Sequence, residues 1–532
     1  MTRKVEVYDT TLRDGTQAEN FNLSVDDKIK ICKQLDRFGI DFIEGGWPGS
    51  SPLAVEFFSR MQDVGLHHSR LTAFGSTRHW KNLPEKDPNL RALLDAKVRA
   101  VTIFGKSWDI HVTEALRISL EDNLTLIEDS LSYLRPRLQH LIYDAEHFFD
   151  GFKNNREYCL ATIERAAAGG AETVVLCDTN GGTLPHEVQE IIPVVFSFLE
   201  EKGLGFVKLG IHTHNDSDTA VASALTALHL GVQQVQGTIN GFGERCGNSS
   251  LTSIIPALTF KMGIFTEAGN NIDQLYTTSR LVNELANMPQ DQYMPYVGES
   301  AFAHKGGVHV SAVQRNPLTY EHIEPEKVGN IRRVLVSDQA GKANILTKAK
   351  KYSIPLQEDD PLMASIISEM KERENQGYQY EAAEASFELL MRSALGLKRK
   401  FFVLESFRVM NHKYSMEKSP LTEATIRLSV GGKAVHTAAM GDGPVNALDK
   451  ALRKALTCFY PGLEEVELID YKVRVLTGEH GTGAKVRVLI ESRDKDDSWG
   501  TVGVSVNIME ASWQALVDSM NYKLLKDEKA KN

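Results

Sequence analysis

The sequence has few cysteines, no long apolar run and no leader-like start. Its five cysteines are scattered without a C-x-x-C pair, so they do not form a disulfide framework and are typical of a reducing compartment. The N-terminus runs straight into a charged segment without an apolar signal core. No stretch approaches the roughly 18 consecutive apolar residues of a membrane span. These absences predict a cytoplasmic protein that does not associate with membranes.

Positive charge is also in deficit. Lysine and arginine number 60 against 70 aspartates and glutamates, which gives a net charge of −10. General nucleic-acid binding needs a basic surface and is therefore not expected, although a local basic patch for a phosphate-bearing ligand is compatible with this balance. At 532 residues the chain is too long for one hydrophobic core, which predicts two or three domains.

The first half of the chain alternates short β-branched runs with longer amphipathic segments. The expected strands are residues 5–9, 42–45, 71–74, 101–104, 141–145, 173–177, 208–214 and 234–238. The expected helices between them include residues 25–38, 53–64, 120–134, 156–168, 187–201, 219–230 and 251–262. Eight βα units in about 260 residues match a (β/α)8 TIM barrel.

The rival arrangement is an open doubly wound sheet, which usually carries a Gly-rich phosphate turn after its first strand. The first strand here leads into Asp9-Thr-Thr-Leu-Arg-Asp-Gly-Thr-Gln17, which is not such a turn. The predicted fold class is therefore α/β, with a (β/α)8 barrel over residues 1–270.

Two further regions follow the predicted barrel. Residues 271–396 are expected to form a helical linker subdomain, with helices across 360–395 interrupted near Asn375-Gln-Gly377. Residues 397–532 contain a βββα pattern written twice, which predicts an α+β domain built from an internal repeat. Such a module is either a regulatory and dimerising unit or a purely structural domain. The charged tail from residue 527 onward is expected to fray.

His212-Thr-His214 is the sharpest local signal. Two histidines at i and i+2 on a strand point to the same face, and these lie at the C-terminal end of the seventh predicted strand. Barrel enzymes place their active sites at that end, and imidazoles are common ligands for divalent transition metals. An isolated pair of this kind is nevertheless more often structural.

Two oxygen donors are expected on the same rim. Asp14 follows the first strand and Asn248 follows the eighth, and both strands neighbour the seventh when the barrel closes. One carboxylate, two imidazoles and one amide oxygen suit Mn²⁺, Mg²⁺, Co²⁺ or Zn²⁺ as a Lewis acid. The alternatives are a turn role for Asp14 in its Asp-Gly pair and a helix N-cap role for Asn248 before Leu251.

Other strand ends carry candidate catalytic and substrate-binding groups. Arg13 could bind a substrate carboxylate or stabilise an oxyanion, or simply pair with Glu44. Glu146 is a candidate general base, and Thr179 offers a hydroxyl to a substrate carboxylate, while either could instead cap a helix. His309 lies in a Gly-rich segment outside the barrel and is either an acid–base group or an ordinary loop histidine.

Three motifs in this order resemble the DRE-TIM metallolyase superfamily. They are Thr11-Leu-Arg-Asp-Gly-Thr-Gln17, His212-Thr-His-Asn-Asp216 and Gly241-Phe-Gly-Glu-Arg-Cys-Gly-Asn248. The repeated C-terminal module is similar to the allosteric domain of the isopropylmalate synthase and homocitrate synthase branch. Four further segments resemble the long-form (R)-citramalate synthases, namely Glu44–Gly49, Phe74–Arg78, Asp144–Gly151 and Asn375–Tyr380.

The resemblance implies an acyltransferase that converts the acetyl group into an alkyl group on transfer. Acetyl-CoA and pyruvate would condense to (R)-citramalate and CoA in isoleucine biosynthesis. A homodimer would form, with the linker of one subunit reaching the other's barrel and a branched-chain amino acid as effector. Residue by residue, the implied roles are metal ligation by Asp14, His212, His214 and Asn248, charge stabilisation by Arg13, carboxylate binding by Thr179, and catalysis by Glu146 and His309.

Two positions depart from the family's pattern. The tyrosine that often stands two residues before the strand-five glutamate is Asp144 here, which changes the keto-acid pocket. A linker tyrosine is also expected, but an ungapped match falls on Thr319, and the role is carried over to the adjacent Tyr320.

Several alternatives stay open at this point. A 2-isopropylmalate or homocitrate synthase would differ only in its keto acid, and one methylene is worth only about 1–3 kcal/mol of discrimination. Two less favoured interpretations are a cleavage enzyme of the hydroxymethylglutaryl-CoA lyase type and an inactive amino-acid sensor.

Overall fold

The computed structural model describes residues 3–337, 340–416, 419–476 and 483–531. The chain divides into two compact units. The barrel unit comprises Met1–Phe302 with His322–Arg332, and the C-terminal unit comprises Ala303–Glu321 with Arg333–Asn532.

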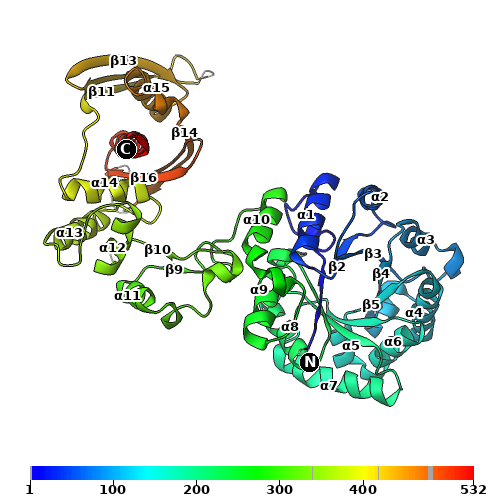
Figure 1. Cartoon of the computed structure of the whole chain (residues 1–532). Helices are drawn as coiled ribbons and strands as arrows, with labels where there is room; N and C mark the ends of the chain where they lie inside the picture. The colour runs from blue at the N-terminus through cyan, green and yellow to red at the C-terminus, as the bar shows by residue number, and fades with distance from the viewer. Residues whose placement is uncertain (1–2, 338–339, 417–418, 477–482, 532) are drawn as a thin grey trace. The chain divides into compact units, whose positions relative to one another are not determined.

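The barrel unit contains a closed barrel of eight strands in sequence order, with β1 paired in parallel to β8. This arrangement confirms the predicted (β/α)8 fold (Figure 1). The strands are β1 (Glu6–Asp9), β2 (Phe42–Gly46), β3 (Arg70–Ser76), β4 (Ala100–Lys106), β5 (His140–Glu146), β6 (Thr173–Asp178), β7 (Lys208–Thr213) and β8 (Gln234–Gly237).

Helices surround the strands and take their ends from local signals. Ser24 and Asp27 form a capping box at the start of α1, and Gly39, at φ +96°, ends it in the left-handed conformation that glycine tolerates. The helices are α1 (Val25–Phe38), α2 (Pro52–Met61), α3 (Pro88–Asp95), α4 (Leu120–Leu134), α5 (Phe148–Asn154), α6 (Arg156–Ala168), α7 (Pro185–Glu201), α8 (Ala220–His229), α9 (Leu251–Ala257) and α10 (Leu275–Leu285).

Side chains alternate between the two faces of each barrel strand. Val7 belongs to the large core between strands and helices, whereas its neighbour Tyr8 belongs to a separate small cluster contributed by strands alone. This cluster consists of Tyr8, Phe42, Ala100, Ile142, Val175 and Cys177. Because successive residues of a strand face opposite sides, the cluster fills the barrel interior. Residues two positions further along the same strands then face the mouth of the barrel.

The C-terminal unit begins with short strands and helices and ends in the predicted repeat. Its first elements are β9 (Ala303–His304), α11 (Gly307–Arg315), β10 (Arg333–Val334), α12 (Lys342–Lys351), α13 (Leu362–Asn375) and α14 (Glu384–Ala394). The repeat comprises β11 (Val403–His412), β12 (Leu421–Val430), β13 (Lys433–Gly441) and α15 (Pro444–Leu456), then β14 (Glu467–Val475), β15 (Val486–Arg493), β16 (Ser498–Ser505) and α16 (Ile508–Lys531).

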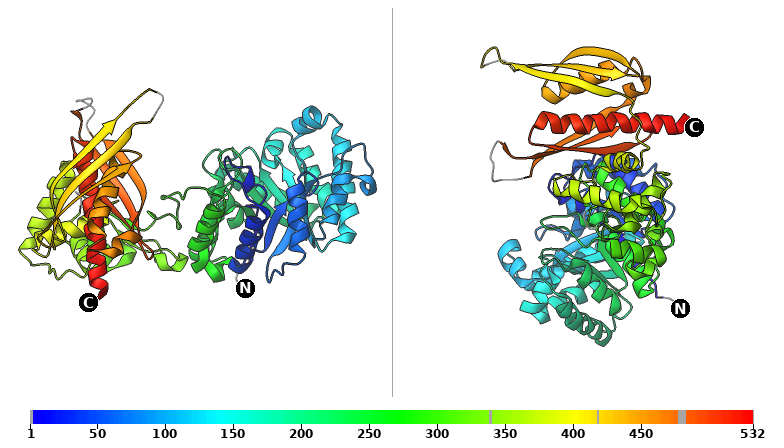
Figure 2. Two further views of the ribbon diagram at one scale, coloured as in Figure 1. Left: turned by 90° about the horizontal axis from the view of Figure 1, so that it is seen from above. Right: turned by 90° about the vertical axis from the view of Figure 1, so that its left-hand side faces the viewer.

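Each half of the repeat is a three-stranded antiparallel sheet followed by a helix. Helices α15 and α16 lie between the two sheets (Figure 2). Leu448 and Leu452 of α15 and Leu516 of α16 are buried in one hydrophobic core there. The predicted repeat of the βββα pattern is therefore confirmed, and its two halves share one hydrophobic core.

The expectation of a frayed C-terminal tail was wrong. Helix α16 continues to Lys531, and only Asn532 of that tail lies outside the described residues. Lys529 Nζ binds Glu388 Oε1 at 2.6 Å, and Glu528 pairs with Arg399. Because these partners are distant in sequence, the charged segment gives no local sign that it is held.

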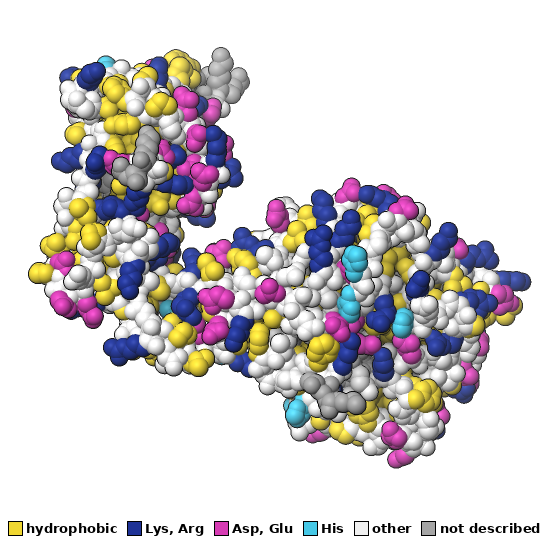
Figure 3. Space-filling view, in the orientation of Figure 1, with side chains coloured by type: hydrophobic (Ala, Val, Ile, Leu, Met, Phe, Trp, Pro, Cys, Tyr) yellow, Lys and Arg dark blue, Asp and Glu magenta, His cyan; other side chains and the backbone are white. Residues whose placement is uncertain are grey.

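Charge of both signs is spread over the surface. On the face shown in Figure 3, basic and acidic side chains are interspersed over both units. Within the described ranges, none of the helices combines the length and apolar character needed to cross a membrane.

Candidate active site

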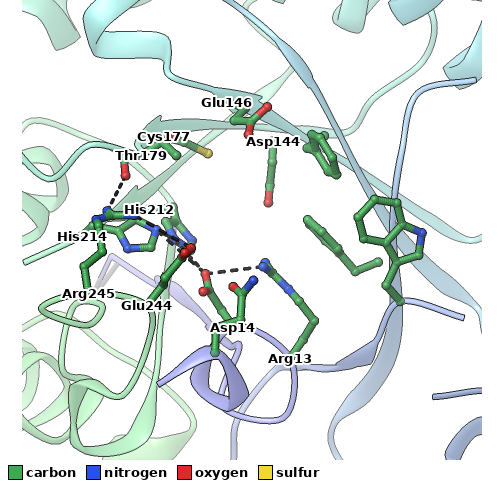
Figure 4. Close-up of a pocket in the computed structure, with 14 residues that line it drawn as sticks. Arg13, Asp14, Asp144, Glu146, Cys177, Thr179, His212, His214, Glu244 and Arg245 are labelled. Atoms are coloured by element: carbon green, nitrogen blue, oxygen red, sulfur yellow. Dashed lines mark hydrogen bonds and ion pairs between the residues drawn. The ribbon is translucent and has the colours of Figure 1, made fainter. Parts of the chain in front are cut away.

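A cavity of about 240 Å³ opens at the C-terminal end of the barrel strands (Figure 4). Strand ends supply most of its lining because inward-facing positions recur at every second residue. The principal lining residues are Arg13, Asp14, Trp47, Phe74, Phe104, Asp144, Glu146, Cys177, Thr179, His212, His214, Glu244 and Arg245.

Asp14, His212 and His214 converge in this cavity. Each offers one ligand atom, and the three atoms lie within 4.8 Å of one another. The Nε2 atoms of the two histidines are 3.3 Å apart, and Asp14 Oδ2 lies 3.5 Å and 3.9 Å from them. All three side chains are buried. Two imidazoles and one carboxylate at this spacing fit a divalent cation.

The electrostatics of the cluster favour a bound positive charge. Burial alone would raise the pKa of Asp14, but Arg13 and His212 outweigh it and hold that pKa well below its usual range. Burial, followed by the charge of His212, lowers the pKa of His214 to about 3. The carboxylate is thus ionised and the second imidazole is neutral at pH 7, which are the forms that bind metals.

Asn248 lies beside this cluster but does not line the cavity. Its backbone forms a bridge with that of His214, and its Nδ2 donates to the Phe242 carbonyl at 3.2 Å. Its buried Oδ1 accepts no hydrogen bond from the described residues. The N-cap of α9 is Ser250, so the helix-capping interpretation of Asn248 was wrong. An orphaned amide oxygen is costly, and a cation would satisfy it.

A chain of hydrogen bonds orients His212. His212 Nδ1 lies 2.9 Å from Gln236 Oε1, and Gln236 Nε2 donates to Asp144 Oδ1 at 3.0 Å. Because Gln236 presents its carbonyl oxygen, Nδ1 carries a proton, and Nε2 faces Asp14 and His214. Burial, followed by the charge of Glu44, raises the pKa of Asp144 to about 7.

Replacing Gln236 with leucine is expected to raise the dissociation constant for Mn²⁺ about 10- to 100-fold, because His212 loses the acceptor that fixes its tautomer. Isothermal titration calorimetry of the full chain measures this. Gln234→Leu is the matched control, since Gln234 is a buried glutamine on the same strand whose amide atoms contact no hydrogen-bond partner among the described residues. Equal Mn²⁺ affinities for the two variants would contradict the positioning role.

Arg13 forms the pair with Glu44 that was considered as the alternative to a substrate role. Its Nε donates to Glu44 Oε1 at 2.5 Å, and its Nη1 lies 3.5 Å from Asp14 Oδ2. The guanidinium also lies 3.8 Å from the centre of the Phe74 ring. Tyr8 donates to the other Glu44 oxygen at 2.6 Å. The ion pair with Glu44 therefore fixes Arg13 at the cavity wall, beside the metal-ligand cluster.

Glu146 and Thr179 lie on the opposite side of the cavity from Arg13 (Figure 4). Glu146 pairs with Lys106, which the strand register places directly beside it on β4. Thr179 Oγ1 accepts from the backbone N–H of His147 at 2.8 Å, so it links the segments that follow β5 and β6, whereas the N-cap of the next helix, α7, is Leu184. Arg245 donates to the Thr179 carbonyl at 2.8 Å.

His309 and Tyr320 belong to the C-terminal unit. Their rings stack with centroids 4.1 Å apart and an interplanar angle of 25°. Tyr320 is 47% exposed. His304 instead binds Glu321 at 2.9 Å and is buried, which is typical of a structural histidine. The two predicted linker residues thus form a pair with each other.

Known families match the chain in three segments. The HMGL-like family matches residues 4–282, the homocitrate synthase post-HMGL domain-like family residues 296–377, and the LeuA allosteric (dimerisation) domain residues 381–524. An HMGL-like barrel of this type implies a divalent metal, in agreement with the Asp14, His212 and His214 cluster.

Full-length relatives point to one group within this family. An (R)-citramalate synthase of Geobacter sulfurreducens is 57% identical, with 98% of both chains covered. One of Aquifex aeolicus is 52% identical, with 99% of both chains covered. A probable 2-isopropylmalate synthase of Methanopyrus kandleri is 31% identical over 98% of both chains. The chain therefore belongs to the HMGL-like family and, within it, to the group of the (R)-citramalate synthases.

Proposed function

We propose that the chain condenses acetyl-CoA with pyruvate and releases (R)-citramalate and CoA, a transferase reaction of isoleucine biosynthesis. The observation that carries the proposal is one cavity in which Arg13, Glu146 and Thr179 surround the Asp14, His212 and His214 cluster. Relatives named (R)-citramalate synthase at 43–57% identity support pyruvate as the keto acid.

Asp14, His212, His214 and Asn248 would hold the metal, which is Mn²⁺, Mg²⁺, Co²⁺ or Zn²⁺. When bound, the ion supplies Lewis acidity that polarises the keto group of the substrate. The Thr179 hydroxyl and the Arg13 guanidinium provide the groups that recognise the keto-acid carboxylate. Trp47, Phe74 and Phe104 form an aromatic wall that limits the space for its side chain.

Glu146 acts as the base. Its carboxylate takes a proton from the acetyl methyl group, and the resulting enolate carbon attacks the keto carbon. Arg13 stabilises the negative charge that develops on oxygen. Water then cleaves the thioester, releasing CoA and the product carboxylate. The stacked pair His309 and Tyr320 assists proton transfer or water activation from the linker of a homodimeric partner.

The proposal also assigns a role to each of the three regions of the chain. Residues 1–270 carry catalysis, residues 271–396 connect, and residues 397–532 dimerise and bind a branched-chain amino acid as feedback effector. The match to the LeuA allosteric (dimerisation) domain supports this assignment.

A keto-acid panel with a thiol-release assay tests the function. Pyruvate is expected to exceed 2-oxoisovalerate and 2-oxoglutarate in kcat/KM by about 100-fold or more, because the aromatic wall of Trp47, Phe74 and Phe104 limits the space for a larger side chain. Isoleucine and leucine are then added to the preferred reaction to identify the effector. A clear preference for 2-oxoisovalerate would favour the isopropylmalate synthase alternative, and acetyl-CoA production without condensation would favour a lyase.

A further inference from the structure

Arg245 belongs to the loop that follows β8 and lines the catalytic cavity, but the reaction proposed above gives it no role. Its side chain is 40% exposed, yet its guanidinium makes three hydrogen bonds. Nε and Nη2 donate to the two carboxylate oxygens of Asp216 at 2.8 and 2.9 Å, and Nη2 also donates to the Thr179 carbonyl at 2.8 Å (Figure 4). This arginine therefore joins the segments that follow β6, β7 and β8.

We infer that Arg245 is a positioning residue, which holds the main chain of Thr179 in the place from which the Thr179 hydroxyl binds the substrate carboxylate. The inference rests on the proposed function, in which Thr179 recognises the keto acid. Arg245 acts through Thr179 and does not itself contact the substrate.

The hydroxyl of Thr179 is available for this task. Its Oγ1 accepts from the His147 N–H at 2.8 Å, and within the described residues it makes no other hydrogen bond. A hydroxyl that accepts one hydrogen bond still carries its own proton, which it can donate to a carboxylate oxygen. Because His147 holds the side chain of Thr179 and Arg245 holds its main chain, the two contacts together fix the direction of that donation.

The backbone near Arg245 is shaped so that the three segments approach closely. Arg245 has φ +57°, in the left-handed region that residues other than glycine seldom adopt. Gly181, at φ +65°, packs against Asp216, and a Cβ at Gly181 would lie 2.4 Å from Asp216 Oδ2. The N–H and the hydroxyl of Ser217 both donate to the Gly181 carbonyl, at 3.0 and 2.6 Å. The Asp216 carboxylate is thus fixed where it can orient the guanidinium toward Thr179.

A direct electrostatic role for Arg245 is the rival explanation. A cation at the cavity wall could attract the keto acid by its charge alone. Asp216 offsets that charge through a bidentate ion pair, whereas the contact with Thr179 depends on the planar fork of the guanidinium, which lysine lacks. Lysine at this position therefore separates the two roles.

Kinetics of the full chain test the inference. Thr179→Val is expected to raise the KM for pyruvate about 10- to 100-fold, because a hydrogen bond to a charged group is lost. Arg245→Met should raise it about tenfold and leave the KM for acetyl-CoA unchanged, and Arg245→Lys should behave like Arg245→Met. In the Thr179→Val background, Arg245→Met should add less than about twofold, because both changes remove the same contact with the substrate.

Arg165→Met is the matched control. Arg165 is 42% exposed, pairs with Glu128 at 2.7 Å and Glu121 at 3.3 Å, and lies on α6 outside the cavity. Its replacement should leave both KM values at wild type. Amide hydrogen exchange gives a second readout that needs no substrate. Arg245→Met should accelerate exchange in residues 178–182 and 215–218, whereas Arg165→Met should not.

The outcomes separate the positioning role from the function. A wild-type KM for Arg245→Lys would overturn the role, because charge alone would then suffice. A full tenfold loss in the Thr179→Val background would overturn it too, since Arg245 would then act independently of Thr179, and so would unchanged exchange in residues 178–182. Accelerated exchange there would support the positioning of Thr179 even if the wild type forms no citramalate, in which case only the proposed function fails.

Discussion

His212→Ala is expected to abolish metal-dependent condensation while leaving the fold intact. His212 supplies one of three converging ligand atoms, and its Nε2 lies 3.3 Å from that of His214. Removing one imidazole leaves Asp14, His214 and the proposed ligand Asn248, which hold a divalent ion far more weakly. Mn²⁺ affinity should fall at least about 100-fold, and turnover about a thousandfold or more, because the polarisation that the ion provides is worth several kcal/mol.

Mn²⁺ titration followed by electron paramagnetic resonance and thiol-release kinetics measure the two effects. His229→Ala is the control, since His229 ends α8 at the far end of the barrel and is exposed. Both variants should retain the circular dichroism spectrum of the wild type. Wild-type turnover of His212→Ala at saturating metal would refute the assignment of this residue as a ligand.

The sequence was sufficient for the elements whose signals are local. Helix α1 was predicted at its observed ends because Ser24 caps it and Gly39 terminates it. Strand β6 was predicted within one residue because its β-branched run is short and fully buried. Helices α3 and α5 were not predicted, since seven or eight residues make only about two turns, which is too short for a 3.6-residue pattern to be distinguished.

The residues of the candidate site divide in the same way, into those that the sequence could identify and those that depend on contacts between distant segments. Asp14, His212 and His214 could be grouped in advance because a closed barrel places the ends of its first and seventh strands on one rim. Gln236 and Lys106 could not be found in this way. Each acts through a neighbour across the sheet, His212 for Gln236 and Glu146 for Lys106.

Strand register is the physical reason for that difference. It depends on how two segments separated by tens of residues pack together, and the sequence of either strand alone does not specify which residues become neighbours. The alternation of Gln234 and Gln236 with apolar residues in β8 marks both as inward-facing, which is the only signal in the sequence that could have drawn attention to them. A polar residue at an inward position near a strand's C-terminal end is therefore a sensible candidate in other barrels.

Glu146→Gln tests the proton-transfer step and should give the second large effect. Glutamine keeps the shape of the side chain but cannot accept the acetyl methyl proton, so kcat should fall by about 10²- to 10⁴-fold. The KM for pyruvate and the affinity for Mn²⁺ should change little, because Glu146 belongs to neither the metal cluster nor the carboxylate-binding pair. Exchange of the acetyl-CoA methyl protons in D₂O, followed by mass spectrometry, should be lost together with citramalate formation.

Glu172→Gln provides the matched control. Glu172 is a carboxylate of similar exposure, at 26% against 23% for Glu146, and it pairs with His140 at the opposite end of the barrel. It should keep wild-type kcat and wild-type exchange. If Glu146→Gln loses condensation but still exchanges the methyl protons at the wild-type rate, another group removes the proton, and Glu146 instead positions the enolate or Lys106. A normal kcat for Glu146→Gln would exclude both roles.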